Sequence, residues 1–129
     1  MNALYVAAGG ALGALSRYGI SLLSMRLFPG AATVTGWLGT LLSNVLGAFL
    51  IGFLATMAQG AFPDKAWLTP LLIVGFCGGF TTFSSFVLDG YRLFEAGQTA
   101  SALLYLLLSL ILTFAALLCG FYAAGCCFK

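Results

Sequence analysis

Four long apolar stretches run through the sequence, and they limit its possible folds more than any other feature. They lie near residues 3–25, 34–58, 67–89 and 99–124, separated by short segments rich in polar residues, Gly and Pro. A helix needs about 20 mostly apolar residues to cross the hydrocarbon core of a membrane. The 129 residues therefore accommodate four spanning helices with short connections. We predict an all-α integral membrane protein in which residues 1–129 form a single transmembrane domain.

Charged side chains are scarce, and this excludes several classes of function. Only 6% of the residues are charged, and the net charge of +2 is too small for a nucleic-acid interface. The sequence has no His, and its only carboxylates are Asp64, Asp89 and Glu95, so acid–base catalysis lacks its usual groups. We expect membrane lipid as the surroundings, and a channel, carrier or scaffold rather than an enzyme.

The positive charges give almost no signal for orientation. An even number of spans places both termini on one face, with Lys65 and Lys129, and leaves Arg26, Arg92 and the nearby Arg17 toward the other. Orientation normally follows a surplus of Lys and Arg in the cytoplasmic loops. A near tie fits insertion in both orientations, which predicts an antiparallel homodimer. A weak bias toward one orientation fits the same charges equally well.

The four cysteines are Cys77, Cys119, Cys126 and Cys127. They show no C-x-x-C spacing and lie in or beside apolar stretches. We expect them to be small buried hydrophobic residues rather than a disulfide framework or a zinc site.

Small residues recur at helical spacing in the first two stretches. Gly9 and Gly13 are four residues apart, as are Gly39, Ser43 and Gly47. Each set lies on one helix face and lets another backbone approach closely. We expect close helix packing to be their role.

The third stretch contains a segment whose residues do not favour a continuous helix. Gly78 and Gly79 are followed within a few residues by four hydroxyl side chains, those of Thr81, Thr82, Ser84 and Ser85. We predict a helix break in the middle of the membrane, which must face protein, water or ions because lipid cannot satisfy free backbone groups. Its carbonyl groups suit a small cation, and the N–H groups that open the second half-helix favour an anion.

Phenylalanines follow this segment at helical spacing. Phe83 and Phe86 are three residues apart and share a helix face, and Phe80 is expected to continue the row one turn earlier. The edge of an aromatic ring is positive, so rings pointing edge-first into a narrow passage attract a small anion without a formal charge. Packing against other helices or lipid is the ordinary alternative.

The fourth stretch carries a row of hydroxyl groups, Ser101, Tyr105, Ser109 and Thr113, each four residues from the last. They form one stripe along a helix, although single hydroxyls in membrane helices often bond to their own backbone.

The second stretch adds Asn44, next to Ser43 and one turn from Thr40. Its side-chain NH₂ can donate twice to an anion, or it can bond to a neighbouring helix. A cation or proton carrier would need a carboxylate within the membrane, and Asp89 falls at the end of the third predicted span. The donor-rich interior therefore favours an anion.

Three segments together resemble the Fluc (CrcB) fluoride channels, and the third is the most specific. They are Gly9-Gly10-x-x-Gly13-Ala14-x-x-Arg17-Tyr18, Gly39-Thr40-x-x-x-Asn44-x-x-Gly47 and Gly75-Phe76-Cys77-Gly78-Gly79-x-Thr81-Thr82-Phe83-Ser84-x-Phe86. The resemblance implies a dual-topology homodimer in the bacterial inner membrane. Its two antiparallel pores would export fluoride passively and protect the cell from it.

The resemblance also implies roles for individual residues. Asn44, Phe83 and Phe86 correspond to the fluoride pore, together with the Thr82 and Ser84 hydroxyls of the same motif. The polar track of the fourth helix would comprise Tyr105, Ser109 and Thr113. Backbone carbonyls of Gly78 and Thr81, each contributed twice, would hold a structural Na⁺ at the dimer interface, and Arg17 would draw anions into a vestibule. Bonding of Arg17 to helix ends, or snorkelling to the interface, is the alternative.

Two other functions remain open at this point. A small four-span, dual-topology exporter of drugs or guanidinium-type compounds is expected to have an essential carboxylate in the membrane, which the predicted spans lack. A purely structural membrane protein would use the hydroxyl stripe for packing alone.

Overall fold

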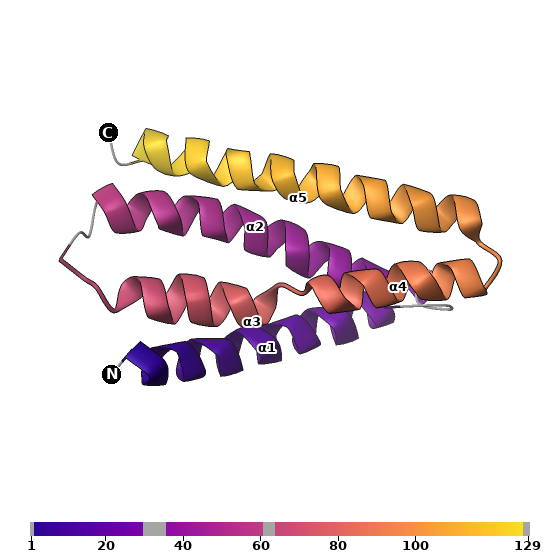
Figure 1. Ribbon diagram of the computed structural model, residues 1–129, viewed down its shortest axis with the longest axis horizontal. Helices are drawn as coiled ribbons and strands as arrows, with labels where there is room; N and C mark the ends of the chain where they lie inside the picture. The colour runs from indigo at the N-terminus through magenta and orange to yellow at the C-terminus, as the bar shows by residue number, and fades with distance from the viewer. Residues whose placement is uncertain (1, 30–35, 61–63, 128–129) are drawn as a thin grey trace.

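The computed structural model describes residues 2–29, 36–60 and 64–127, and this part of the chain is helical without strands. Helix α1 is Asn2–Leu27, α2 is Trp37–Gly60 and α5 is Thr99–Cys127. Between α2 and α5 lie a π-helical segment, η1 (Thr69–Cys77), one short turn, α3 (Gly78–Phe80), and α4 (Phe83–Glu95). Figure 1 shows these elements as neighbouring, roughly antiparallel rods.

Four helical stretches are long and apolar enough to cross a membrane, which confirms the predicted all-α protein with four spans. They are Asn2–Leu27, Trp37–Gly60, Thr69–Glu95 and Thr99–Cys127. The predicted bounds differ from these by a few residues at most ends, and the predicted start of the second span at residue 34 lies outside the described residues.

The predicted end of the third span at residue 89 is wrong. Helix α4 continues to Glu95, six residues beyond the position where polar residues suggested a loop. The Asp89 carboxylate is buried inside the protein and accepts a hydrogen bond there, so it does not end the helix. The chain reverses later, at Gly97, whose φ of +73° is readily adopted by glycine.

The central helix is α2, which contacts every other helix in the described part of the chain. Helix α1 packs against η1 and α3, the first half of the third span, whereas α5 packs against α2 and α4. Figure 1 shows α1 and α5 on opposite sides of this arrangement. The two halves of the third span therefore have different neighbours.

Glycines permit backbone-to-backbone contact between α1 and the third span. A Cβ atom on Gly13 would overlap the carbonyl oxygen of Phe76 and lie 2.8 Å from the backbone nitrogen of Phe80. A Cβ on Gly9 would lie 2.8 Å from the backbone nitrogen of Phe76, and one on Gly79 would overlap the carbonyl of Gly10. The close helix packing predicted from the spacing of Gly9 and Gly13 is therefore confirmed.

The start of α1 and the end of α5 lie at the same end of the molecule (Figure 1). The segment between α2 and η1, which contains Lys65, is at this end. The last turns of α1 and α4, which contain Arg26 and Arg92, are at the other end. Lys129, which the sequence predicts on the same face as Lys65, lies outside the described residues.

The prediction that all the cysteines are buried is wrong for three of them. Cys77 is fully buried, whereas Cys119, Cys126 and Cys127 are exposed, and all four thiols are free. The three exposed residues lie on α5, and in the described part of the chain this helix packs against α2 and α4 alone, so much of its surface is uncovered within one chain.

Candidate functional site

The third span changes conformation at two threonines. Helix α3 ends at Phe80, and α4 begins at Phe83. Between them the backbone is extended, with φ −86° and ψ 157° at Thr81 and φ −153° and ψ 122° at Thr82. An α-helix pairs each N–H with the carbonyl four residues earlier. Two extended residues interrupt this pattern, so the N–H groups of residues 82–85 and the carbonyls of residues 78–81 need other partners.

Asn44 on α2 binds both polar groups of the Thr82 backbone. The backbone N–H of Thr82 donates to Asn44 Oδ1 at 2.7 Å, and Asn44 Nδ2 donates to the Thr82 carbonyl at 3.0 Å. The amide of Asn44 therefore holds the extended segment in place. One of its two N–H donors is used in this way, which leaves one for a ligand.

The Thr82 side chain forms the N-cap of α4. Its hydroxyl oxygen accepts the backbone N–H of Ser85 at 3.2 Å and donates to Ser85 Oγ at 3.1 Å. Its oxygen also lies 3.2 Å from Ser84 Oγ. Threonine is among the preferred N-cap residues because its oxygen satisfies one of the free N–H groups at a helix start. The hydroxyls of Thr82 and Ser84, both predicted in the pore, are thus joined at this helix start.

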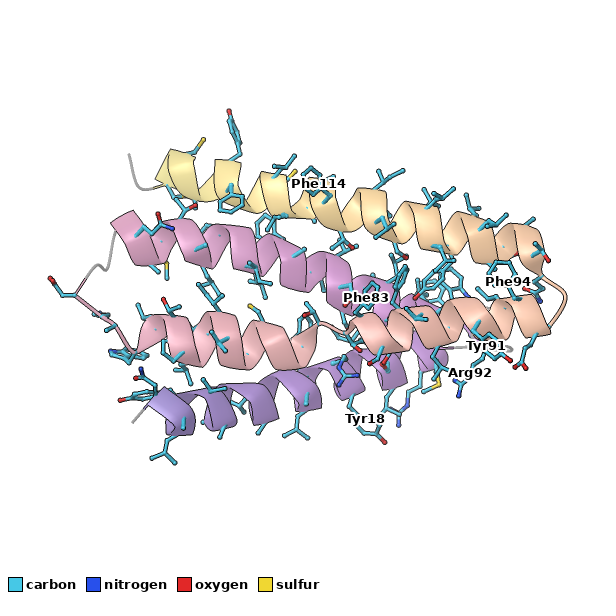
Figure 2. All side chains as sticks on the ribbon, viewed as in Figure 1. Tyr18, Phe83, Tyr91, Arg92, Phe94 and Phe114 are labelled. Carbon is cyan, nitrogen blue, oxygen red and sulfur yellow. The ribbon has the colours of Figure 1, made fainter. Side chains whose placement is uncertain are left out.

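Arg17 on α1 binds the other side of the interruption. Its Nε donates to the carbonyl of Gly79 at 3.2 Å, which corresponds to the helix-end bonding given above as an alternative. A role in a vestibule stays a prediction. The neighbouring Tyr18 is 63% exposed and points away from the other helices (Figure 2).

Several backbone groups at the interruption are left over. Of the four N–H groups, those of Thr82 and Ser85 are bonded to side chains as described, and those of Phe83 and Ser84 have no partner within the described residues. Of the four carbonyls, that of Gly79 is bonded to Arg17. The remaining carbonyls, those of residues 78, 80 and 81, receive no N–H from the same part of the chain. The break therefore presents both free acceptors and free donors.

A pocket of about 480 Å³ lies beside this break, bounded by α2, α4 and α5. Its polar lining comprises Asn44, Thr81, Thr82, Ser109 and Thr113. Its aromatic lining comprises Phe83, Phe86 and Phe114, and the aliphatic remainder is Ala48, Ile51, Leu110 and Leu117. No charged side chain lines the pocket among the residues that the structure describes.

A chain of aromatic rings begins with two phenylalanines of the pocket lining and continues beyond the pocket. The ring centroids of Phe83 and Phe86 are 5.6 Å apart, and those of Phe86 and Tyr105 are 5.5 Å apart. Tyr105 also meets Trp37 edge-on at 5.8 Å. Phe83, labelled in Figure 2, is 73% exposed, whereas Phe86 is buried.

The predicted continuation of the phenylalanine row through Phe80 is wrong. Phe80 lies before the extended threonines and stacks on Phe76, with ring centroids 5.6 Å apart. The two extended residues rotate α4 relative to α3, so helical spacing does not carry across them.

The structure places the hydroxyl stripe of α5 in two different settings. Ser109 and Thr113 line the pocket, and Tyr105 is buried against Phe86, whereas Ser101 is exposed near the start of α5. The hydroxyl oxygens of Tyr105, Ser109 and Ser43 are buried and have no hydrogen-bond partner in the described part of the chain. Buried polar groups are rarely left unpaired, so each such hydroxyl needs an explanation.

Sequence reasoning missed a buried carboxylate near the aromatic chain. Asp89 is only 5% exposed, and Thr40 on α2 donates to its Oδ2 at 2.7 Å. Asp89 does not line the pocket. Its spacing from Phe86 and Leu93, three residues before and four after, places it on the buried face of α4 and was the available signal.

Comparison with known proteins identifies the family. A family model described as "CrcB-like protein, Camphor Resistance (CrcB)" matches residues 4–121. The chain belongs to this family. Because it also has four apolar helices, it is a multi-pass membrane protein of the bacterial cell membrane.

Relatives in this family cover nearly the whole chain. A protein of Paracoccus denitrificans is 45% identical over 117 residues, which are 91% of this chain and 89% of that protein. A protein of Rhizobium leguminosarum is 43% identical over 120 residues, or 93% of both chains. One of Cereibacter sphaeroides is 45% identical over 120 residues, which are 93% of this chain and 91% of that protein. All three are named fluoride-specific ion channel FluC.

Proposed function

We propose that the protein is a fluoride-selective ion channel that lets fluoride leave the cell passively and so lowers its toxicity. The observation that carries the proposal is the match to relatives that are named fluoride-specific ion channels. These matches are 43% and 45% identical and cover 93% of the chain. The pocket beside the break supplies a physical basis, since it offers hydroxyls, an amide and phenyl rings and no charged group in its described lining.

Neutral donors suit fluoride conduction for a physical reason. Fluoride is small and strongly hydrated, so it leaves water only where other donors replace its hydration shell. A fixed positive charge would hold it, whereas hydroxyl groups and ring edges bind it weakly enough for release. A narrow passage also favours fluoride over the larger chloride ion.

The proposed path uses the residues of the pocket and its aromatic chain. Phe83 and Phe86 present ring edges, the free N–H of Asn44 donates, and the hydroxyls of α5 continue the path. The full set is Asn44, Thr82, Phe83, Ser84, Phe86, Tyr105, Ser109 and Thr113. The unpaired buried hydroxyl of Ser109 supports this path, because an ion or water in the passage would satisfy it.

We further propose that two copies assemble as an antiparallel homodimer with two pores, each subunit inserted in the opposite orientation. The near tie of positive charges at the two ends supports dual insertion. The large exposure of Phe83 within one chain supports a second copy that covers this region. Single-cysteine variants at each end, labelled from outside intact vesicles with an impermeant reagent, test the orientation. Labelling of each site in about half of the molecules supports dual insertion, and labelling from one side only contradicts it.

The break in the third span would lie at the middle of the membrane and hold a structural Na⁺ between the two subunits. The carbonyls of Gly78 and Thr81 fit such a site, because their helical donors are diverted to Asn44 Oδ1 and Thr82 Oγ1. A Cβ atom placed on Gly78 would also meet no other atom of the chain within 4 Å, so there is open space beside this residue. When bound, Na⁺ would satisfy free carbonyls and offset repulsion between fluoride ions. Replacement of Na⁺ by a large organic cation should weaken assembly and flux, and unchanged behaviour would count against the site.

Asp89 is the observation that favours the second candidate, a four-span exporter of cationic drugs or guanidinium-type compounds. It is a buried carboxylate within the third span, as that class is expected to have. It lies outside the described pocket lining, however, and its carboxylate is bonded to Thr40. The two candidates differ in what drives transport, since the exporter exchanges its substrate for protons.

Flux from proteoliposomes separates these candidates. Vesicles loaded with fluoride and K⁺ are diluted into K⁺-free buffer, and the K⁺ ionophore valinomycin is added to balance the charge. A channel releases fluoride rapidly only after valinomycin, retains chloride in matched vesicles, and needs no proton gradient. Fluoride efflux that requires a proton gradient, or guanidinium transport in its place, would contradict the channel.

A further inference from the structure

Trp37, the first residue of α2, packs inside the protein. Its ring is half-buried and contacts the cluster of Phe86, Leu93, Ala102 and Tyr105. It meets the Tyr105 ring edge-on, with ring centroids 5.8 Å apart. Tryptophans near the ends of membrane helices commonly lie at the interface with the lipid headgroups. A tryptophan that packs on a tyrosine of the proposed path therefore needs a different explanation.

Trp37 belongs to the side of α2 that faces the pocket. It is followed, at alternating steps of four and three residues, by Leu41, Asn44, Ala48 and Ile51, and the last three of these line the pocket. Residues at this spacing share one face of a helix. Asn44 is separated from Trp37 by about 10 Å along the helix axis. Trp37 thus lies on the same face, beyond the pocket and toward the end of the molecule where α2 begins.

The Tyr105 ring is in contact with aromatic rings from two other helices. Phe86 of α4 and Trp37 of α2 have ring centroids 5.5 and 5.8 Å from that of Tyr105. The contact between α4 and α5 is close, because a Cβ on Gly90 would lie 2.8 Å from Leu106 Cδ2. Helix packing therefore holds Phe86 near Tyr105, and the Trp37 ring supplies the aromatic contact from α2.

The closest backbone approach between α2 and α5 lies far from Trp37. A Cβ on Gly52 would overlap the carbonyl oxygen of Leu117, and one on Gly120 would overlap that of Phe49. Gly52 is about 22 Å from Trp37 along the axis of α2. Removal of the Trp37 ring therefore leaves a space beside Tyr105 that this distant backbone contact does not close.

We propose that Trp37 is a positioning residue of the fluoride path, which acts by holding the Tyr105 ring against Phe86. This inference rests on the proposed function and extends the machinery of the path to a residue outside the pocket. With Trp37 in place, the Tyr105 hydroxyl stays in a row with Ser109, one turn further along α5. Without the indole, the tyrosine ring turns into the vacated space, and its hydroxyl leaves the path.

The strength of one aromatic contact sets the size of the expected effect. Loss of an edge-on ring pair shifts the balance between two ring orientations by about two- to tenfold. We expect fluoride efflux to fall by a similar factor when the indole is removed. The residues of the pocket itself are unchanged in such a variant, so efflux should fall without being abolished.

Three variants test the role of the ring. Trp37→Leu removes the ring and keeps an apolar side chain, whereas Trp37→Phe keeps one aromatic ring. The matched control is Trp67→Leu, because Trp67 also packs on a tyrosine, Tyr5, with ring centroids 6.1 Å apart. That pair lies before η1 and at the start of α1, at the opposite end of the molecule from the start of α2.

Fluoride efflux is measured in proteoliposomes with valinomycin, on protein that elutes as a single peak in size-exclusion chromatography. We expect slower efflux with Trp37→Leu, recovery of most of the rate with Trp37→Phe, and the unmodified rate with Trp67→Leu. Normal efflux with Trp37→Leu would overturn the proposal. Equal losses with Trp37→Leu and Trp67→Leu would also overturn it, because they would trace the effect to a general loss of aromatic packing.

A fluorescence measurement tests the contact with Trp37 left in place, and it decides alone if Trp37→Leu does not fold. In Trp67→Phe protein, Trp37 is the only tryptophan. Indole emission is sensitive to nearby charge, so fluoride at the Tyr105 hydroxyl should change the emission of Trp37, and chloride should not. Tyr105→Leu should abolish the change. Emission that ignores fluoride, or that responds equally in Tyr105→Leu, would overturn the proposal.

The two measurements also separate this inference from the channel function. Absence of fluoride efflux from the unmodified protein would contradict the proposed function itself. Rapid efflux from the unmodified protein, together with normal efflux from Trp37→Leu, would contradict the role of Trp37 and leave the channel intact.

Discussion

The two halves of the third span differ in what they pack against and in what they offer. The first half, η1 and α3, packs closely against α1, and glycines on both sides permit the contact. The second half, α4, faces α2 and α5 and meets them through Asn44, Thr40 and Tyr105. One half thus fixes the position of the span, and the other carries polar groups toward the pocket. Thr81 and Thr82, both extended, separate the two halves.

The largest expected effect comes from the packing half. Gly13→Val would place side-chain carbons where the Phe76 carbonyl lies, and neither backbone can move without displacing the whole span. We expect loss of folded protein, measured as loss of the monodisperse peak in size-exclusion chromatography in detergent. The control is Gly19→Val on the same helix, where a Cβ meets nothing within 4 Å. Equal yields of the two variants would show that the close contact is not needed.

The next effect comes from the polar half and should leave the fold intact. Phe86→Ile and Phe83→Ile replace a ring edge by an aliphatic group at the pocket. We expect fluoride efflux to fall to the protein-free level while the chromatographic profile stays unchanged. Phe94→Ile, at the far end of α4, should conduct normally. Normal flux in both pocket variants would remove the phenyl edges from the mechanism.

A smaller effect is expected where α4 joins α2. Thr40→Val removes the hydroxyl that donates to the buried Asp89 carboxylate. Leaving a buried acceptor unpaired costs about 1–3 kcal/mol, so the free energy of unfolding in detergent should fall by that amount. Thr56→Val is the control, because that hydroxyl bonds only to the carbonyl of Gly52 in its own helix.

A double-mutant cycle sharpens this third test. When Asp89→Leu is combined with Thr40→Val, the loss of stability should be smaller than the sum of the single losses, because the pair is removed together. Additive losses would show that Thr40 and Asp89 stabilise the fold independently.

The smallest effect is expected on the outer face of α4. Tyr91 is 57% exposed and donates to Glu95 Oε1 at 2.8 Å, on the side of α4 that Figure 2 shows facing away from α5. Exposed pairs of this kind contribute little to stability. Tyr91→Phe should therefore change neither unfolding nor fluoride flux. A clear loss of flux would mean that the polar role of α4 is not limited to its buried face.

The sequence predicts the four helices because hydropathy alone determines them. It also predicts the groups around the break, since Asn44 and the Gly-Gly-x-Thr-Thr segment belong to specific motifs. The close approach of Gly9 and Gly13 to the third span follows from their spacing on one face of α1. These features depend on local patterns, and local patterns are what a sequence displays directly.

The features that sequence reasoning missed depend on contacts between distant segments. The continuation of α4 through Asp89 depends on Thr40, which lies 49 residues earlier. The direction of Phe80 depends on the dihedral angles of Thr81 and Thr82, which helical spacing does not predict. The use of the Asn44 amide on the Thr82 backbone likewise becomes visible only when α2 and the third span are placed together.

The central claim is that neutral donors along the polar half of the third span select a dehydrated fluoride ion. The most direct test is the reversal potential of single-protein currents in a planar bilayer that separates solutions of different fluoride, chloride and proton concentration. The account predicts a reversal potential that follows the fluoride gradient and does not shift when the chloride or proton gradient is changed. A reversal potential that follows chloride or protons would contradict it.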